Sequence, residues 1–515
     1  MVDGTATVSD RQAGLRHAGS ASKVRARWFS MEMVNWTLIG IGALLRIAQY
    51  ASNRSLWFDE SFLALNVLNR SLGGLLRPLD YGQGAPIGFL VLEKLLAQTF
   101  GDSEYVLRLV PLLAGLIALV LFYRVARDTI RPGAVPIALG LLVILDPLIY
   151  YASEVKQYSS DVAVALILLC SAQAALGKRG ALTVPRTLVF ALTGAVALWF
   201  SHPATFVLMG VGAAALAVGF RDADWVRMRR LAMAGLVWII SLGLLYYVSL
   251  RQLRTNTELL TYWGNAFLPF PPSPASVRWL GATFFKIFEY PVGLIAPGIG
   301  VGTLAFLVGA TALWTENWGA FLALILPLVF ALGASAFHLY PFADRLLLFG
   351  VPFIVLFIGE GAAALIEAAK PRLPWTGVIL VGLLVLHPAL SATSSLVKPR
   401  TLEEIRPVVA YLRAHEQSGD AVYLYYGAVP AFKYYARRYG FGRDSYVEGV
   451  YSRGDRGRYV ADLDRLRGRR RAWFVFSHLY KDEEEFFLSY LDSRGRKVES
   501  FVRDGAGTYL YDLGK

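Results

Sequence analysis

Residues 33–60 read MVNWTLIGIGALLRIAQYASNRSLWFDE, an apolar run that ends on two adjacent carboxylates. A membrane-spanning helix needs about 20 consecutive apolar residues, and residues 33–51 provide this length with a single charge, Arg46. The polar stretch that follows, closed by Asp59 and Glu60, therefore begins where the helix leaves the bilayer. The segment predicts an integral membrane protein with charged side chains at one membrane surface.

The composition of the chain agrees with this prediction. Its 515 residues are 55% hydrophobic and 17% charged, whereas soluble domains carry about 25% charged residues, and the mean hydropathy is +0.46. The only cysteine, Cys170, cannot pair within the chain, which excludes a disulfide scaffold. The net charge of +13 does not indicate nucleic-acid binding, because cationic loops on the cytoplasmic face of a membrane protein give the same excess.

Reading for apolar runs gives about eleven expected spans, with boundaries good to about four residues. They cover residues 33–51, 105–126, 135–151, 160–176, 184–200, 204–220, 231–250, 292–313, 318–337, 346–369 and 375–392. Residues 400–515 hold 21 Lys/Arg and 17 Asp/Glu, a density near that of soluble proteins. The fold class expected is a polytopic α-helical membrane domain, residues 31–398, followed by a small α/β domain, residues 399–515.

Lys and Arg residues collect in alternate short loops. They are Lys23, Arg25, Arg27, Arg124, Arg127, Arg131, Lys178, Arg179, Arg186, Arg221, Arg227, Arg229, Arg230, Lys370 and Arg372. Cationic loops remain in the cytoplasm, so residues 1–30 are expected as a cytoplasmic tail and residues 399–515 outside the cytoplasm. The protein is expected in the cell (inner) membrane, in contact with membrane lipids.

Two outward loops are long. Residues 52–104 have apolar side chains at helical spacing, interrupted by turns at 78–86, as in helices that lie along the membrane surface. Residues 251–291 are rich in aromatic residues and proline, which suits either an aromatic anchor or a lid over a lipid-binding groove. In the last part, helices are expected at 402–415, 431–438 and 483–491, and strands at 421–426, 472–477 and 508–511.

Charged residues in the outward turns are the candidates for chemistry, because ionisable groups are costly beside hydrocarbon. Asp59 and Glu60 suit a catalytic base, with or without a metal; alternatively, Asp59 is the N-cap of the next helix. Glu154 and Lys156 suit binding of a hydroxyl and a phosphate; alternatively, they form a local ion pair.

Two other outward turns carry His202, and His338 with Tyr340 and Arg345. The guanidinium fork of Arg345 matches phosphate oxygens, although an arginine anchored to lipid headgroups has the same pattern. His202 alone is equally well explained as a polar residue that ends a helix. All these residues are expected on one face of the membrane.

The ordered motifs resemble those of the GT-C membrane glycosyltransferases, and more narrowly the family 39 and lipopolysaccharide-core galacturonosyltransferase-like group. The resemblance rests on five stretches across most of the chain: WFDE at 57–60, QGAP at 83–86, FGDSE at 100–104, EVKQYS at 154–159 and YPF at 340–342 with Arg345. Arginine is commoner in that group where Lys156 stands. Further likeness lies in VYLYY at 422–426 and in Phe432, Tyr434 and Tyr435.

The resemblance implies transfer of a sugar from a polyprenyl-phosphate donor to a hydroxyl of an envelope lipid, glycan or protein, with inversion at the anomeric carbon. It implies that Asp59 is the catalytic base, since a carboxylate within reach can take the hydroxyl proton. Lys156, Arg345 and Tyr158 are the expected donor-phosphate residues, and cations there would stabilise the departing charge. Gln83, His202, His338 and Tyr340 complete the expected site.

Glu60 and Glu154 are the further catalytic candidates. Glu154 is expected either to position the acceptor or to share a divalent cation with Asp59; the sequence leaves a metal open, and no cofactor is certain. A lipid or lipid-linked-sugar transporter is the alternative function. Transporters place polar residues in mid-span and have repeated halves, whereas here the polar groups gather at one face and Glu360 is an exception within a span. An envelope scaffold is the third reading.

Overall fold

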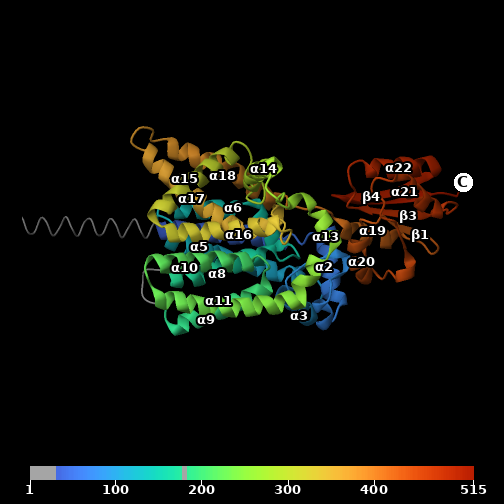
Figure 1. Ribbon diagram of the computed structural model, residues 1–515. Coiled ribbons are helices and arrows are strands. Elements are labelled where there is room, and N and C mark those ends of the chain that lie inside the picture. Colours follow the sequence, from blue (N-terminus) through green and yellow to red (C-terminus); the bar gives the residue numbers. More distant parts are fainter. Residues whose placement is uncertain (1–30, 177–181, 515) are drawn as a thin grey trace, which may run out of the picture.

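The structure, a computed structural model, describes residues 31–176 and 182–514. The expected cytoplasmic tail and two cations of a predicted basic loop, Lys178 and Arg179, lie outside these ranges. A bundle of long helices forms most of the molecule, and the carboxy-terminal strands and helices lie at one end of it, next to α2 (Figure 1). The elements that carry the candidate site are therefore the turns at that end of the bundle.

Within the described residues, eight helices are long and apolar enough to cross a membrane. They are Met31–Ala51, α5 (Leu109–Thr129), α10 (Ala204–Arg221), Trp225–Arg254 with α11 (Trp225–Leu245) as its first part, α15 (Gly298–Glu316), α16 (Trp318–Ala336), Asp344–Ala369 with α17 (Val351–Ala369), and α18 (Thr376–Val397). A bent pair makes a ninth if it counts as one span. Two shorter apolar helices, α8 (Tyr158–Leu176) and α9 (Val184–Phe200), account for the other runs. The expected count of about eleven is thus confirmed only in part.

Two predicted spans have a different form in the structure. The run at 135–151 is broken into α6 (Val135–Ile144) and the helical segment Asp146–Ser153, which meet at 61°. Pro147 has no backbone N–H to continue the first helix, so the chain turns there. The run at 292–313 becomes helical only at Gly298, because Pro291, Gly293 (φ +92°) and Pro297 keep the preceding residues irregular.

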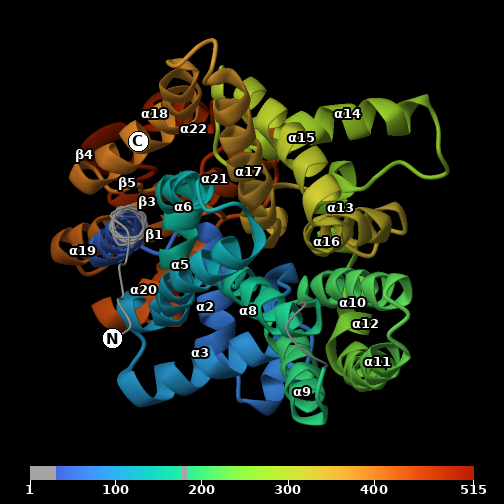
Figure 2. The same ribbon diagram turned by 90° about the vertical axis from the view of Figure 1, so that its left-hand side faces the viewer.

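The bundle has a buried centre and a lipid-facing edge. Of the 18 most apolar consecutive residues in the span containing α17, 94% are buried. The corresponding share in the span that begins with α11 is 17%. Viewed along the bundle, α15 and α17 lie side by side, while α11 lies at the margin (Figure 2). Gly309 and Gly361 allow this contact, since a Cβ on either would meet the backbone of the other helix at under 2.0 Å. Small residues at crossing points allow membrane helices to approach closely.

The charge expected in mid-span is paired. Glu360 of α17 accepts from Arg131, whose Nε lies 2.6 Å from a Glu360 oxygen. Arg131 also contacts Glu316 and Glu367 at 3.0 and 2.6 Å. Arg131 follows the end of α5 that is remote from the candidate site, so this cluster fastens the other end of the bundle.

Both long loops are largely helical, although the sequence predicts helices only in the first. The first contains α2 (Phe58–Asn69), η1 (Gly73–Leu76), η2 (Asp80–Gly82), α3 (Ile87–Phe100) and α4 (Glu104–Leu107). The end of the long α11 span and the second loop contain η4 (Tyr246–Leu250), α12 (Arg251–Arg254), α13 (Thr257–Tyr262), η5 (Gly264–Ala266) and α14 (Pro274–Glu289). Two short segments, α7 (Asp146–Tyr150) with η3 (Tyr151–Ser153) and η6 (Asp344–Gly350), lead into α8 and α17.

The carboxy-terminal part contains one five-stranded sheet in the order β2-β1-β3-β5-β4. The strands are β1 (Ala421–Leu424), β2 (Val447–Glu448), β3 (Ala472–Ser477), β4 (Arg496–Arg503) and β5 (Ala506–Asp512). The helices are α19 (Ile405–His415), α20 (Val429–Tyr439), α21 (Arg456–Leu463) and α22 (Glu483–Arg494), with η7 (Arg443–Ser445) and η8 (Asp464–Leu466). β1 is parallel to β2 and β3, and β5 is antiparallel to β3 and β4.

Buried polar contacts join this sheet region to the first long loop. The Glu104 carboxylate binds Arg406 and Arg438 at 2.9 and 2.7 Å, and it accepts from the Tyr435 hydroxyl at 3.0 Å. Glu404 accepts from both the backbone and the hydroxyl of Ser55. The apolar core of the region is continuous across the junction, with loop side chains such as Leu63 in the same cluster as α19 and α20.

Candidate functional site

Asp59 stands at the centre of the candidate site. It lies in the first turn of α2, whose N-cap is Trp57 with no side-chain cap. The N-cap interpretation of Asp59 is therefore wrong. Its side chain is 13% exposed, and each carboxylate oxygen faces a different cation.

Lys156 reaches Asp59 from the turn before α8. Its ammonium lies 2.9 Å from Oδ1 of Asp59 and 2.7 Å from Oε1 of Gln83, and its side chain is only 5% exposed. This turn follows the helical segment Asp146–Ser153, which is bent away from α6. No ion pair forms between Glu154 and Lys156 within the described residues, so the local-pair interpretation is also wrong.

Arg345 approaches Asp59 from the opposite side. Its Nη2 lies 3.0 Å from Oδ2 of Asp59, and its guanidinium lies 5.7 Å from the ring centre of Tyr158 and 5.8 Å from that of Trp263. The Nε of Arg345 is buried and has no hydrogen-bond partner among the described residues. A buried donor without a partner is costly, so this nitrogen is available to an anionic ligand.

Charges decide the protonation of Asp59. Burial by itself raises the pKa of this carboxyl, but the adjacent Lys156 and Arg345 outweigh burial and hold the pKa below its usual range. An opposite charge at this distance favours the ionised form. Asp59 is thus a carboxylate at neutral pH, bound by two cations.

Glu154 has a different environment. It is fully buried; Oε1 accepts from Nε1 of Trp57 at 3.2 Å, and Oε2 has no partner in the described part of the chain. Burial, together with the negative charge of Glu60, raises the pKa of this carboxyl. A carboxyl with a raised pKa and a free oxygen can hold a proton at a higher pH than an exposed one.

Both carboxylate oxygens of Glu60, the residue after Asp59, have hydrogen-bond partners. One oxygen accepts from Nε of Arg108 and from the backbone N–H of Val155, each at 2.9 Å, and the other accepts from Nη2 of Arg108 at 2.7 Å. Arg54 lies 3.7 Å away. Burial raises the pKa of Glu60, but the two arginines outweigh it and lower the pKa overall. Because both oxygens are used, this geometry favours a structural role instead of the catalytic role expected for Glu60.

Three other predicted residues do not contact the Asp59 cluster. His338 is exposed, has φ +54° and packs against Phe267. Tyr340 donates to the backbone oxygen of Leu346 at 2.7 Å. His202 is half-buried, its Nε2 lacks a partner among the described residues, and burial lowers its pKa to about 4. The structure therefore gathers Asp59, Lys156, Arg345, Gln83 and Tyr158, with Glu154 joined through Trp57.

Two functional candidates were missed in the sequence. Glu403 accepts from the backbone N–H of Phe58 at 3.0 Å and lies 2.7 Å from Nδ1 of His478. The ring of His478 stacks on Phe58 with centroids 4.1 Å apart. Glu403 precedes α19 and His478 follows β3, so neither residue belongs to a motif that sequence spacing could connect to Asp59.

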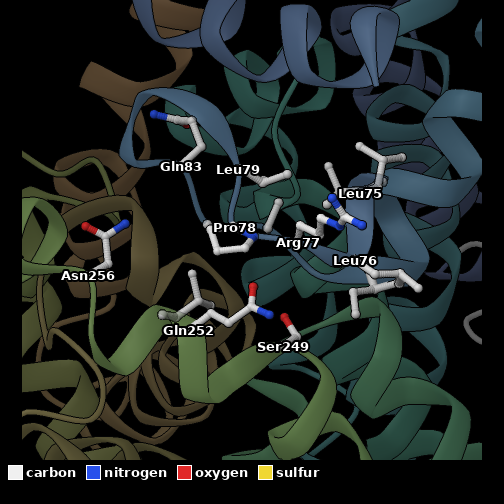
Figure 3. Close-up of a pocket in the computed structure, with 14 residues that line it drawn as sticks. Leu75, Leu76, Arg77, Pro78, Leu79, Gln83, Ser249, Gln252 and Asn256 are labelled. Atoms are coloured by element: carbon white, nitrogen blue, oxygen red, sulfur yellow. The ribbon is translucent and has the colours of Figure 1, made fainter. Parts of the chain in front are cut away.

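A small cavity of about 30 Å³, roughly the volume of one water molecule, adjoins Gln83 of the cluster. Its walls are mostly apolar side chains of the first loop, including Leu75, Pro78 and Leu79, and the α12 region supplies Gln252 and Asn256 (Figure 3). Gln83 lines the cavity and also contacts Lys156. The cavity thus touches the Asp59 cluster at Gln83.

The site does not have the ligand set of a metal centre. Across residues 31–176 and 182–514, no group of three or more His, Cys, Asp and Glu side chains is placed to hold a metal ion. Each oxygen of Asp59 already faces a cationic side chain. A divalent cation shared by Asp59 and Glu154 would have to compete with Lys156 and Arg345, so these residues do not fit one in this arrangement.

Comparison with solved structures identifies the architecture. The chain is similar to ArnT from Cupriavidus metallidurans bound to undecaprenyl phosphate, with a TM-score of 0.56 and 14% identity over 92% of this chain and 98% of that one. The chain therefore shares the overall fold of this ArnT structure. ArnT from the same organism in the apo state gives a TM-score of 0.54 and 13% identity over 92% and 97% of the two chains.

A third structure is less similar. The oligosaccharyltransferase AglB from Archaeoglobus fulgidus, in complex with an inhibitory peptide and a dolichol-phosphate, has a TM-score of 0.49 and 11% identity over 92% of this chain and 74% of that chain. No protein-family model matches the chain, and no curated protein matches its sequence. At these identities the likeness concerns the fold, and the narrower family 39 or galacturonosyltransferase-like assignment stays a prediction.

Proposed function

We propose that the protein transfers a sugar from a polyprenyl-phosphate donor to an acceptor hydroxyl at the outer face of the cell membrane. The observation that carries this proposal is the pair of buried cations, Lys156 and Arg345, that converge on Asp59. Taking a charged side chain out of water is costly. Two cations held at one carboxylate therefore indicate a site that binds an anionic substrate. The similarity in fold to ArnT, which binds undecaprenyl phosphate, supports the same class of donor.

The two cations bind the phosphate of the donor. In a sugar phosphodiester this group carries one negative charge, and a second charge develops on it as the bond to the anomeric carbon breaks. Lys156 and the free Nε of Arg345 are preorganised donors for this charge. Interactions that strengthen as charge develops lower the barrier of the reaction.

Asp59 is the proposed base. While the donor phosphate is absent, Lys156 and Arg345 hold the carboxylate; once they bind phosphate, their hold on Asp59 weakens and its affinity for a proton rises. The acceptor oxygen then attacks the anomeric carbon, its proton passes to Asp59, and polyprenyl phosphate leaves with the bonding electron pair. Attack opposite the leaving group inverts the configuration.

The surrounding residues have supporting roles. Glu154, with one free oxygen, accepts a hydrogen bond from the bound substrate. Gln83 and Tyr158 align Lys156 and Arg345, respectively.

A reconstitution assay tests the function. The full-length protein in vesicles is given undecaprenyl-phosphate donors that carry different sugars, together with a glycolipid extract of cells from which the gene has been deleted. Sugar transfer, and its loss in Lys156→Ala and Arg345→Ala, is expected. Binding of the lipid phosphate with no transfer from any donor, combined with movement of the lipid across the vesicle membrane, would instead indicate the transporter.

A further inference from the structure

The carboxyl edge of the sheet lies next to the candidate site. β1 has β2 on one side and β3 on the other, so the strand order reverses between the parallel strands β1 and β3. In open α/β sheets, ligands bind outside the carboxyl ends of the strands at such a reversal. Here Tyr426 follows β1 and His478 follows β3. The two strand ends are in contact, because a Cβ on Gly427 would lie 2.7 Å from the backbone oxygen of Ser477.

Glu403 and His478 connect this edge to Asp59. Glu403 holds the backbone N–H of Phe58 and Nδ1 of His478 at the same time, through its two oxygens. The Phe58 and His478 rings are parallel within 2°. Since Asp59 directly follows Phe58, the imidazole is held beside the turn that carries the proposed base.

The orientation of His478 leaves one nitrogen free. Nδ1 faces a carboxylate and therefore carries the proton, which makes Nε2 a hydrogen-bond acceptor in the neutral ring. No hydrogen bond to Nε2 is formed within the described part of the chain, and the side chain is 28% exposed. Its φ of +57° is uncommon for a residue other than glycine, and such strain is concentrated at functional sites.

The half-buried Tyr426 and the exposed Tyr451 and Tyr480 lie along this edge. We call Tyr426, Tyr451, Tyr480 and Arg453 the tyrosine patch. The guanidinium of Arg453 lies 5.6 Å from the Tyr426 ring centre and 4.9 Å from that of Tyr480, and its Nη2 donates to the backbone oxygen of His478 at 3.3 Å. Tyr480 is 49% exposed and Tyr451 68%. Aromatic faces pack on the apolar faces of sugar rings, and an exposed guanidinium attracts anionic groups.

We propose that the carboxyl edge of β1 and β3 is the acceptor site, and that it takes the glycan headgroup of an anionic glycolipid. The sugar rings lie on the tyrosine patch, and Arg453 faces their negative charge. Nε2 of His478 accepts a hydrogen bond from a hydroxyl next to the reacting one and so directs the reacting hydroxyl at Asp59. His478 is a positioning residue, and Glu403 fixes its ring. This inference rests on the proposed function and extends it to the acceptor.

Two substitutions at His478 separate substrate contact from folding. Asn tolerates a positive φ and places a polar atom near Nδ1, so His478→Asn preserves the backbone and the contact with Glu403 but loses the distal nitrogen. Gln places a polar atom near Nε2. With the glycolipid extract as acceptor, we expect His478→Asn to raise the acceptor KM by about tenfold or more, the effect of one substrate hydrogen bond, and His478→Gln to raise it by about threefold or less.

A matched control is available in the same region. His415 also lies near a carboxylate, Glu499, at 3.8 Å, and stacks on a tyrosine, but it is on α19 away from the tyrosine patch. His415→Asn should leave the KM for the acceptor and the KM for the donor unchanged. Binding of undecaprenyl phosphate alone should stay within about twofold of wild type in all three variants, since one-hydrogen-bond effects on the acceptor do not reach Lys156 and Arg345.

The outcomes divide clearly. An acceptor KM unchanged in His478→Asn, or weakened undecaprenyl-phosphate binding in parallel with it, overturns the acceptor site while the transfer activity stands. Absence of transfer by the wild-type protein overturns the proposed function itself. Arg453→Ala should raise the acceptor KM without changing kcat, and transfer that goes only to proteins of a total membrane fraction would contradict a glycolipid acceptor.

Discussion

Asp59 and Glu60 are neighbours in one helical turn, yet the two carboxylates sit in opposite kinds of environment. Successive residues on a helix point about 100° apart, so the Glu60 side chain is fully buried whereas that of Asp59 is 13% exposed. Glu60 is saturated by Arg108 and a backbone N–H. Asp59 is held by Lys156 and Arg345, and Arg345 retains a donor without a partner. Both oxygens of Glu60 have hydrogen-bond partners, whereas Oδ2 of Asp59 has none among the described residues. The comparison teaches that a carboxylate with both oxygens bonded holds a fold, whereas one with an oxygen left over is suited to a ligand.

The largest expected effect is on turnover at Asp59. Asp59→Asn preserves the shape of the side chain but removes the proton acceptor, and loss of a general base typically costs about 10²–10⁴-fold in rate. The measurement is initial-rate sugar transfer in vesicles, with the thermal unfolding midpoint as the control for folding. A variant that folds and transfers at the wild-type rate would remove the base assignment.

Glu60→Gln should behave in the reverse way. It leaves Arg108 buried beside a neutral partner, and breaking a buried ion pair costs about 3–5 kcal/mol. We expect a clear fall in the unfolding midpoint in detergent, and transfer per folded molecule close to wild type at low temperature. If stability is unchanged and transfer is lost, the two carboxylates have been assigned the wrong way round.

Arg345→Lys separates the effect of the positive charge at this position from the effect of the guanidinium geometry. Lysine keeps the positive charge but lacks the planar fork and the free Nε, so undecaprenyl-phosphate affinity should fall by about tenfold, the value of one charge-assisted hydrogen bond. Competition of undecaprenyl phosphate against the donor gives this affinity. Arg131→Lys, at the far end of the bundle, is the matched control and should leave it unaltered.

The smallest effect concerns Glu154 and pH. Because burial and Glu60 raise the pKa of Glu154 in the folded protein, folding favours its neutral form. At pH values below the unfolded pKa of about 4.3, Glu154 is neutral in both states and does not lower the free energy of unfolding. At pH values above the raised folded pKa, the buried charge lowers the free energy of unfolding by its full amount. Glu154→Gln should therefore raise the unfolding midpoint by about 2 °C or more at pH 8 and much less at pH 4. An equal shift at both pH values would contradict the raised pKa.

Sequence reasoning located the membrane helices and the turns that form the site. Apolar runs and loop charges were enough to place Asp59, Lys156 and Arg345 on one face, and the structure brings these three side chains into contact. The strand at Ala472–Ser477 was predicted with its observed limits, because a continuous apolar run marks a buried strand. These features depend on local patterns, which a single sequence contains.

Features that depend on packing were not predictable. β2 has two residues, too few for any pattern, and β4 at the sheet edge has an exposed, charged sequence. Nothing in the sequence distinguished the closed Glu60 from the open Asp59, because their partners lie about 50 to 290 residues away along the chain. Glu403 and His478 reach the site only through the position of the sheet against α2.

The attachment of Glu104 to Arg406, Arg438 and Tyr435 has a consequence for protein engineering. One carboxylate from the first loop serves three side chains of the sheet region, so exchanging that region with a distant homologue strands a buried anion. Functional chimeras should therefore require residues 52–104 and 399–515 to be exchanged together, because the two regions depend on each other's charged side chains.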